Sequence, residues 1–377
     1  MQIGLYVHFP FCKSKCLYCD FNSQVASTQL RERYLAALIH QLQRLPAGLA
    51  GTHITTVFFG GGTPTIYSAG DLARVLDTIS TSDRLQADAE ITCEANPDTV
   101  DASKLETLQA AGINRLSLGV QSLIDAELET LGRSHDSATA LAAAAAARDI
   151  FGNLSLDIIY GIPGQTATSW AATLAGVIAL QPDHISAYGL MIEEDTPLFE
   201  MVAAGQLQPH DDDTYADLYE QAQSTLAASG YEQYEISNFA RPGRRCRHNL
   251  IYWRNQQYLG AGAGAASYLK GLRSVSVADP ETYCKAVAAG EDVIASAERL
   301  DKPHRAAETI MLGLRTTEGA DLRQLSQACA LDLQSRHHDT IAALVAEGIA
   351  SYDDSVLRLT PEKGFLLHSQ VARRFLG

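Results

Sequence analysis

The chain has 377 residues, of which 46% are apolar and 19% are charged, a composition typical of a globular protein. It carries 29 Lys and Arg against 44 Asp and Glu, and the net charge of −15 argues against a nucleic-acid partner, whose phosphates it would repel. No stretch approaches the ~18 consecutive apolar residues of a transmembrane helix, and the first residues do not resemble a signal peptide. We therefore expect a cytoplasmic protein without a transmembrane segment.

Short β-rich runs alternate with segments of helical composition from Ile3 to about Ile236. The predicted strands are residues 3–9, 55–60, 89–95, 114–120, 154–161 and 184–190. The predicted helices are residues 28–45, 70–81, 101–111, 137–150, 166–180 and 211–229. Strands separated by helices indicate a parallel sheet, here an incomplete (β/α)6 barrel, with a doubly wound open sheet as the alternative. In either fold the functional groups belong at the C-terminal ends of the strands.

The composition changes after Ala240. The sequence RPGRRCRHNLIYW is first basic and then aromatic, and a Gly/Ala-rich turn region follows it. From about Arg299 the pattern predicts helices followed by a β-hairpin. We therefore expect a core domain over residues 1–236, a connecting segment over 237–298, and a small, mainly helical C-terminal domain with a hairpin wing over 299–377.

Three cysteines lie close together in the loop after the first predicted strand. Cys12, Cys16 and Cys19 have a C-x3-C-x2-C spacing, and the other four cysteines of the chain are isolated. In a reducing compartment such a group indicates a metal site and not a disulfide framework. A zinc site built locally from four cysteines is not available. Three thiolates suit a [4Fe–4S] cluster with one iron left open for a ligand outside the protein, although half of a zinc site stays an alternative.

Polar and glycine residues gather at the ends of the second to fifth predicted strands. They are Gly61, Gly62, Thr63, Glu94, Gln121, Arg133 and Asp157. Glycine allows a ligand to approach the backbone closely, and carboxylates with an arginine suit a ligand that carries a ribose, an ammonium and a carboxylate. Each of these residues alone would more often be a surface group or a strand-end cap. Their positions at successive strand ends predict one site.

The cysteine spacing after a first strand resembles the signature of the radical S-adenosylmethionine (radical SAM) enzymes, over residues 1 to about 236. The resemblance implies that SAM binds the open iron through its methionine moiety, and that an electron from the cluster can cleave SAM to a 5′-deoxyadenosyl radical. It also implies that Tyr6 and Tyr18 contact SAM together with the strand-end residues, with the Tyr18 ring near the adenine.

Four further segments, YVHFPFC, GGGTPT, NRLSLGVQS and DIIYGIPGQT, resemble the oxygen-independent coproporphyrinogen III oxidase group. The oxidases carry a fourth cysteine two residues after the third, where this chain has Phe21. The group also contains heme chaperones, which are marked by an H-N-x-x-Y-W sequence, here HNLIYW at residues 248–253. The resemblance therefore implies a chaperone that delivers heme to apo-hemoproteins. The alternative is the oxidase, or another radical SAM enzyme acting on a porphyrin-like substrate, so enzymatic activity stays open.

The HNLIYW sequence predicts heme-binding residues. A neutral imidazole is a good axial ligand, so His248 is the predicted ligand of heme iron, and the rings of Tyr252 and Trp253 could stack on the macrocycle. In the alternative interpretation His248 caps a turn, while the two aromatic residues anchor the second domain on the barrel. Many relatives carry a further His in the following turn, where this chain has Ala266.

Four arginines precede His248, at positions 241, 244, 245 and 247. One or two of them could pair with heme propionates, because Arg offers a planar fork of donors to a carboxylate. A solvated linker and a docking site for an acidic partner or for anionic lipid head groups are the alternatives. The resemblance further implies a homodimer and membrane-bound respiratory hemoproteins as recipients of the heme.

Overall fold

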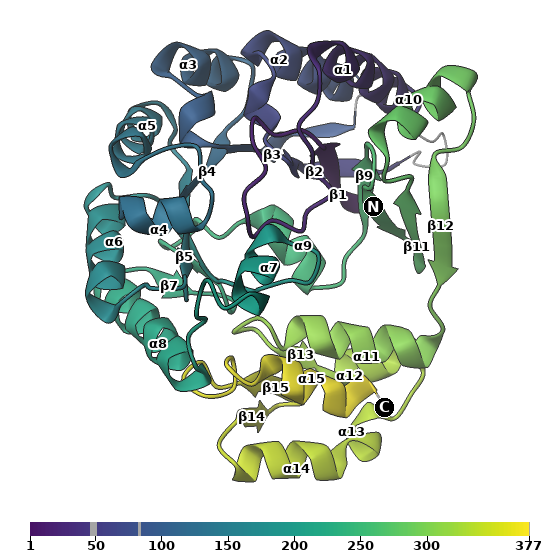
Figure 1. The fold of residues 1–377 in the computed structure, drawn as a ribbon. Coiled ribbons are helices and arrows are strands. Elements are labelled where there is room, and N and C mark those ends of the chain that lie inside the picture. Colours follow the sequence, from purple (N-terminus) through teal and green to yellow (C-terminus); the bar gives the residue numbers. More distant parts are fainter. Residues whose placement is uncertain (46–50, 82–83, 377) are drawn as a thin grey trace.

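The computed structural model describes residues 1–45, 51–81 and 84–376, and Figure 1 shows its architecture. Six strands lie side by side in chain order, and each pairs in parallel with the next. They are β1 (Gln2–Phe9), β2 (His53–Gly61), β3 (Leu85–Ala95), β4 (Arg115–Gln121), β5 (Leu154–Tyr160) and β6 (His184–Gly189). All six strands were predicted, and the predicted parallel sheet is confirmed.

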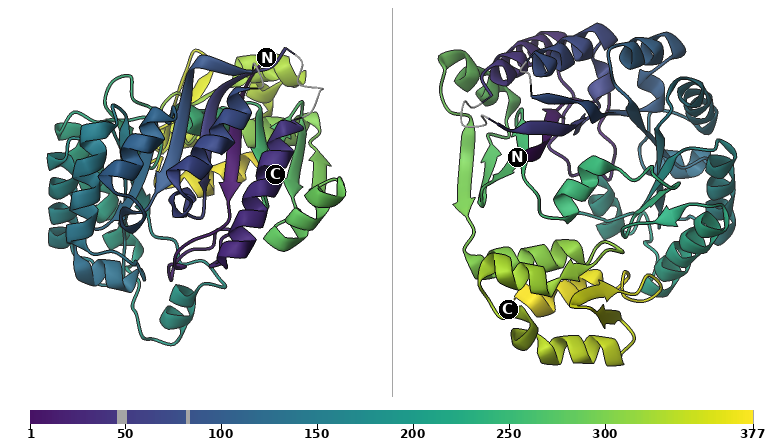
Figure 2. Two further views of the ribbon diagram at one scale, coloured as in Figure 1. Left: turned by 90° about the horizontal axis from the view of Figure 1, so that it is seen from above. Right: turned by 180° about the vertical axis from the view of Figure 1, so that it is seen from behind.

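Helices cover the outer face of the curved sheet, as Figures 1 and 2 show. The main ones are α1 (Thr28–Gln43), α2 (Ala69–Ser80), α3 (Ala102–Ala110), α5 (Ser137–Ile150), α6 (Ala167–Ala179) and α8 (Asp212–Ala228). The shorter α4 (Asp125–Thr130) and α7 (Pro197–Ala203) lie next to the loop that follows β1, where Leu131 and Leu198 bond to the backbone of Leu17. In α2, Leu72, Val75, Leu76 and Ile79 are buried at the spacing of one helical face. The Ser68 side chain caps the first turn of this helix. The six longer helices are those that the sequence predicted.

Further strands extend both edges of the parallel sheet. β8 (Asn238–Ala240) pairs antiparallel with β6 and carries β7 (Glu232–Gln233). On the other edge, β9 (Tyr258–Ala261) pairs in parallel with β1, and β10 (Ala266–Leu269), β11 (Leu272–Ser276) and β12 (Ile294–Arg299) follow it, with α10 (Pro280–Ala289) packed on α1. The twelve-stranded sheet is therefore mixed, with parallel strands in the middle and antiparallel pairs toward both edges. In the described residues the two edges do not pair with each other, so the barrel is incomplete.

The C-terminal region is mainly helical and lies beside the open side of the sheet (Figures 1 and 2). Its helices are α11 (Lys302–Gly313), α12 (Leu322–Cys329), α13 (Leu333–Arg336), α14 (His338–Ala346) and α15 (His368–Leu376). A three-stranded antiparallel sheet joins β13 (Ala320–Asp321), β15 (Val356–Leu359) and β14 (Ala350–Asp353) in that order. The β14–β15 hairpin is the predicted wing, so the predicted fold class is confirmed.

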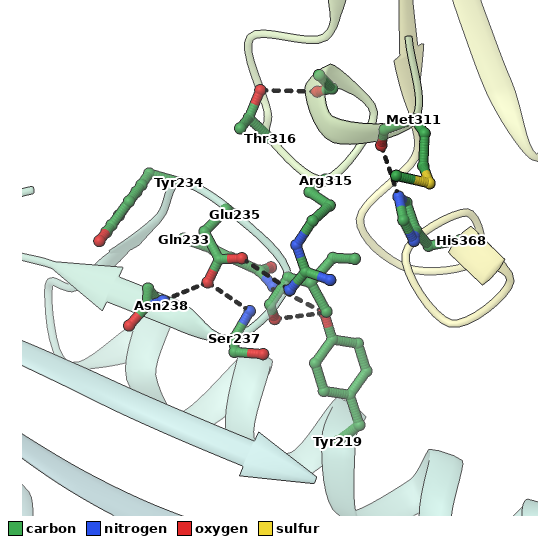
Figure 3. A network of polar contacts seen from close by, with 12 residues as sticks. Tyr219, Gln233, Tyr234, Glu235, Ser237, Asn238, Met311, Arg315, Thr316 and His368 are labelled. Atoms are coloured by element: carbon green, nitrogen blue, oxygen red, sulfur yellow. Dashed lines mark hydrogen bonds and ion pairs between the residues drawn. The ribbon is translucent and has the colours of Figure 1, made fainter. Parts of the chain in front are cut away.

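A buried ion pair fastens this region to the core (Figure 3). The carboxylate of Glu235, which is fully buried, accepts hydrogen bonds from the Ser237 amide at 2.9 Å, the Asn238 side chain at 2.5 Å and Arg315 at 3.2 Å. Burial raises the pKa of Glu235, and the Arg315 charge opposes that rise. The Arg315 guanidinium also lies 4.3 Å from the centre of the Trp253 ring. The last residue of HNLIYW therefore contacts the C-terminal region.

Candidate functional site

The loop between β1 and α1 carries the three cysteines across the C-terminal end of the sheet. The Cys12 amide donates to the carbonyl of Gln24 at 3.0 Å and so closes the base of the loop. Its tip is held from two sides, because the Leu17 amide donates to the Leu131 carbonyl at 3.0 Å and the Leu17 carbonyl accepts from the Leu198 amide at 2.8 Å. The loop therefore presents its thiols from a fixed backbone.

All three thiols are half-buried, and polar groups face them. Thr63 donates its hydroxyl to the Cys12 sulfur at 3.7 Å, and Arg133 donates to the Cys16 sulfur at 3.4 Å. Burial raises the pKa of the Cys12 and Cys19 thiols, a cost that bound iron would offset by stabilising the thiolates. In the described part of the chain, no three His, Cys, Asp or Glu side chains converge on one point as a single metal ion requires. The donor set fits a cluster, which takes one thiolate at each of three irons.

A cavity of about 580 Å³ lies inside the barrel next to this loop, within the usual size range of small-molecule sites. The three cysteines line it. So do all nine residues expected to contact SAM, namely Tyr6, Tyr18, Gly61, Gly62, Thr63, Glu94, Gln121, Arg133 and Asp157. The sheet therefore brings residues from five strands and the loops that follow them to one cavity, and their contact with SAM stays a prediction.

The glycines after β2 are required by close packing. Gly61 has a φ of 111°, and a side-chain carbon there would lie 2.4 Å from the His8 ring. A side-chain carbon on Gly62 would lie 2.6 Å from the carbonyl oxygen of Phe11. The Gly61 amide donates to a Glu94 carboxylate oxygen at 3.2 Å. The turn thus packs on the cysteine loop and leaves backbone groups facing the cavity.

Two half-buried carboxyl groups, Glu94 and Asp157, face the cavity. Burial and the nearby Asp157 raise the pKa of Glu94 to about 8. Burial also raises the pKa of Asp157, although its carboxylate accepts from the hydroxyls of Ser117 at 2.9 Å and Ser155 at 3.2 Å. A ligand that offers an ammonium or hydroxyl groups would compensate both carboxyl groups, which suits the chemistry predicted for this site.

Both terminal nitrogens of Arg133 donate hydrogen bonds near the cysteine loop, whereas its Nε atom has no partner among the described residues. One of its terminal nitrogens donates to the Asn96 side chain at 2.6 Å and to the Gly119 carbonyl at 3.0 Å, and the other donates to Cys16. Asn96 in turn donates to the Thr63 hydroxyl at 3.1 Å. This chain of bonds fixes the guanidinium beside the cysteine sulfur, where its charge favours a thiolate.

Several cavity residues were missed by the sequence reasoning. They include Phe58, Asn96, Arg115, Ser117, Ser186, Tyr188 and Asn249. Most lie on strands at the period of two that sets one face of a sheet, as in the series Ser117, Gly119 and Gln121 on β4. Counting back along each strand in steps of two from the residue already identified at its end would have found most of these residues.

The HNLIYW sequence forms a short helix, α9 (Arg247–Trp253), at the other end of the cavity. His248 and Tyr252 line the cavity, whereas Trp253 faces the C-terminal region. The His248 side chain is 1% exposed, and its Nδ1 and Nε2 atoms share hydrogen bonds with the hydroxyls of Thr56 at 2.7 Å and Tyr252 at 2.8 Å. Burial lowers the pKa of His248 to about 3, so the imidazole is neutral. Ligation of iron would require one of these two bonds to break.

The four arginines before His248 lie outside the cavity. In the part of the chain that the structure describes, none of them lines it. Arg244 lies 3.5 Å from Asp183, and Arg245 contacts Glu232 and Glu318 at 3.6 and 3.5 Å. These partners lie at the end of the barrel remote from the cysteine loop. The arrangement does not support pairing of these arginines with propionates of a ligand inside the barrel.

Comparison with known proteins identifies the family. Residues 6–175 match the radical SAM superfamily, and residues 300–367 match the HemN C-terminal domain. The heme chaperone HemW of Bacillus subtilis is 35% identical over 374 residues, which cover 99% of this chain and 98% of that protein. The chain belongs to the HemW family of radical SAM proteins. HemW of Mycobacterium tuberculosis is likewise 37% identical over 379 residues, covering 99% of this chain and 95% of that protein.

The HemW-family chain also shares its fold with a solved enzyme of the superfamily. Coproporphyrinogen III oxidase (HemN) from Escherichia coli superposes with a TM-score of 0.85 at 26% identity, covering 99% of this chain and 89% of that chain. The predicted resemblance to the oxidase-like group is thereby confirmed. No helix among the described residues has the length and apolar character needed to cross a membrane.

Proposed function

We propose that this HemW-family protein is a heme chaperone, which binds heme and delivers it to apo-hemoproteins. In this proposal Cys12, Cys16 and Cys19 hold a [4Fe–4S] cluster, and SAM occupies the adjacent part of the cavity. The observation that carries the proposal is one cavity lined by the three thiols, the nine expected SAM residues and three members of HNLIYW. Relatives named heme chaperones align with the chain over 99% of its length.

The residues near the cysteine loop have separate tasks in this proposal. Arg133 holds a positive charge against Cys16 and favours its thiolate. Glu94 and the backbone after β2 offer hydrogen-bonding groups to the amino-acid part of SAM, and the ring of Tyr18 covers the adenine. When bound, the cluster would supply a single electron to SAM, and these residues would orient the bound molecule and exclude water.

Heme binding involves the rim and the far end of the cavity in this proposal. The exposed side chains of Phe21 and Met191 line the rim, 63% and 68% exposed, and apolar groups of this kind suit a macrocycle. His248 becomes an iron ligand when its bond to Tyr252 is exchanged for iron. Recipients among membrane-bound respiratory hemoproteins, a homodimer and a cytoplasmic location complete the proposal.

Anaerobic heme transfer tests the proposal. The purified protein, with its cluster reconstituted, is loaded with heme and mixed with an apo-hemoprotein, and the Soret spectrum follows the transfer. We expect tight heme binding and appearance of the acceptor's own spectrum. Absence of heme binding would contradict the proposal.

The second candidate function is an oxidase, which the likeness to HemN favours and Phe21 at the fourth-cysteine position opposes. Formation of 5′-deoxyadenosine together with conversion of coproporphyrinogen III would support this candidate. Metal analysis of the same preparation distinguishes a cluster from zinc.

A further inference from the structure

One positive charge in the cavity has no partner. Arg115, the first residue of β4, is 2% exposed and lines the cavity. Among the described residues its side chain makes no hydrogen bond or ion pair, and its Nε atom is buried without an acceptor. A buried cation is costly unless it is paired and hydrogen-bonded. The structure therefore contains a strong donor group that is left unused.

The nearest carboxylates are already committed elsewhere. Glu90 accepts hydrogen bonds from the amides of Arg247 at 3.0 Å and His248 at 2.9 Å, and so satisfies the first turn of α9. Asp157 accepts hydrogen bonds from the serine hydroxyls already described. Both acids favour the charge of Arg115 from a distance, but neither contacts it.

A second donor that lines the cavity lies on α9, whose first turn bonds to Glu90. Asn249 lines the same cavity, and within the described ranges its side-chain amide has no hydrogen-bond partner. A guanidinium presents a planar fork of N–H groups that matches the two oxygens of a carboxylate, and an amide can add a further donor. Two unused donors at one end of a cavity therefore suit a carboxylate group of a ligand.

This end of the cavity is remote from the cysteine loop. Arg115 begins β4 and Gln121 ends it, so the two residues lie roughly 20 Å apart along a seven-residue strand. Arg133, which contacts Cys16, occupies the end near the loop. An anion bound by Arg115 is therefore distinct from a carboxylate that binds an iron of the cluster.

We infer that Arg115, assisted by Asn249, binds a carboxylate of the ligand at the α9 end of the cavity. The inference rests on the proposed function, in which this carboxylate is a propionate of heme. In this inference the propionate pairs with Arg115 on β4, and not with the arginines that precede His248. SAM also carries a carboxylate, and the experiment must separate the two sources.

Titrations of the full-length, cluster-containing protein test the inference. Wild type, Arg115→Gln, Arg115→Lys and Asn249→Ala are titrated with heme, with heme dimethyl ester and with SAM. We expect Arg115→Gln to weaken heme binding at least about tenfold and to leave the ester and SAM unchanged, because only heme presents propionates. Arg115→Lys should keep part of the affinity, and Asn249→Ala should lose less than Arg115→Gln. Arg244→Gln is the matched control and should leave the affinities for heme, heme dimethyl ester and SAM unchanged.

Thermal unfolding without heme provides a second readout. Because Arg115 makes no hydrogen bond in the described chain and Glu90 and Asp157 act on its charge only from a distance, Arg115→Gln should change the melting temperature little. A clear drop, with equal losses for heme and its ester, would overturn the inference, since the arginine would then act through structure. Weaker SAM binding with unchanged heme binding would overturn the heme assignment. Wild-type protein that binds no heme overturns the proposed function and the inference together, whereas wild-type heme binding without dependence on Arg115 overturns the inference alone.

Discussion

The two ends of the cavity each contain an arginine, and the two arginines differ in their hydrogen bonding. At the cysteine-loop end, Arg133 donates to Asn96, Gly119 and Cys16. At the α9 end, Arg115, which is more deeply buried, contacts no acceptor in the described chain. The first end is organised before any ligand binds, because protein groups accept hydrogen bonds from both terminal nitrogens of its arginine. The second end still needs an anion, so we expect ligand binding to affect it more strongly.

The cluster gives the largest expected effect. Cys16→Ser should abolish visible iron–sulfur absorbance, as should the same change at Cys12 or Cys19, because each thiolate holds a separate iron. Serine at the isolated Cys284 is the control and should leave the absorbance intact. The spectrum and the iron content of anaerobically purified protein provide the measurement, and loss of the cluster in the control would show that the ligand set is wrong.

Arg133 should control binding at the loop end. Arg133→Met removes three charged hydrogen bonds, and we expect SAM affinity to fall about 10- to 100-fold, with little change for heme dimethyl ester. Calorimetric titration of both ligands measures the effect. If Arg133→Met weakened binding of the ester as much as binding of SAM, the two ends of the cavity would not be separate binding sites.

The α9 end should depend on the C-terminal region for its stability. Arg315→Met breaks the pair with the buried Glu235 and uncovers the ring of Trp253, so we expect a loss of about 1–3 kcal/mol in unfolding free energy. Denaturant unfolding measures the loss, and Arg374→Met, which breaks a more exposed pair with Glu347, is the control. Equal effects of the two changes would argue against a special anchoring role.

The pH dependence of stability should show that the His248 imidazole is buried in its neutral form. Its pKa is about 3 in the folded protein and near the ordinary value of about 6.5 in the unfolded chain, which therefore binds more protons below pH 6.5. Stability should fall as the pH is lowered from about 6.5, and His248→Gln should make this fall shallower. Melting temperatures between pH 4 and 8 test the difference, and identical slopes would show that His248 is not buried in its neutral form.

Regular features of the core could be predicted from the sequence. The six strands and six long helices follow from hydrophobic periodicity, and residues such as Glu94 and Asp157 could be placed because parallel strands end at one edge. The strands β9 to β12 were not predicted. β9 and β10 are short and lie in a Gly/Ala-rich region, and β12 is exposed along its whole length, so these strands lack a clear apolar alternation. The predicted division at residues 236 and 298 stays a prediction, although residues from 237 to 298 extend both edges of the main sheet.

The α9 end illustrates what a linear sequence conceals. Four arginines beside His248 suggested an anion site, yet neighbours in sequence face away from the cavity and meet acids such as Asp183. Arg115 looked like an ordinary residue at the start of a strand. Its lack of a partner depends on Glu90 and Asp157 being committed to other donors, which only the three-dimensional arrangement reveals.

Iron anomalous diffraction from crystals grown with SAM and heme tests the central claim most directly. The account predicts iron density beside Cys12, Cys16 and Cys19, and a separate heme iron within the cavity, with a propionate against Arg115. Heme iron located outside the barrel, for example beside Trp253 or at the turn before Ala266, would contradict it.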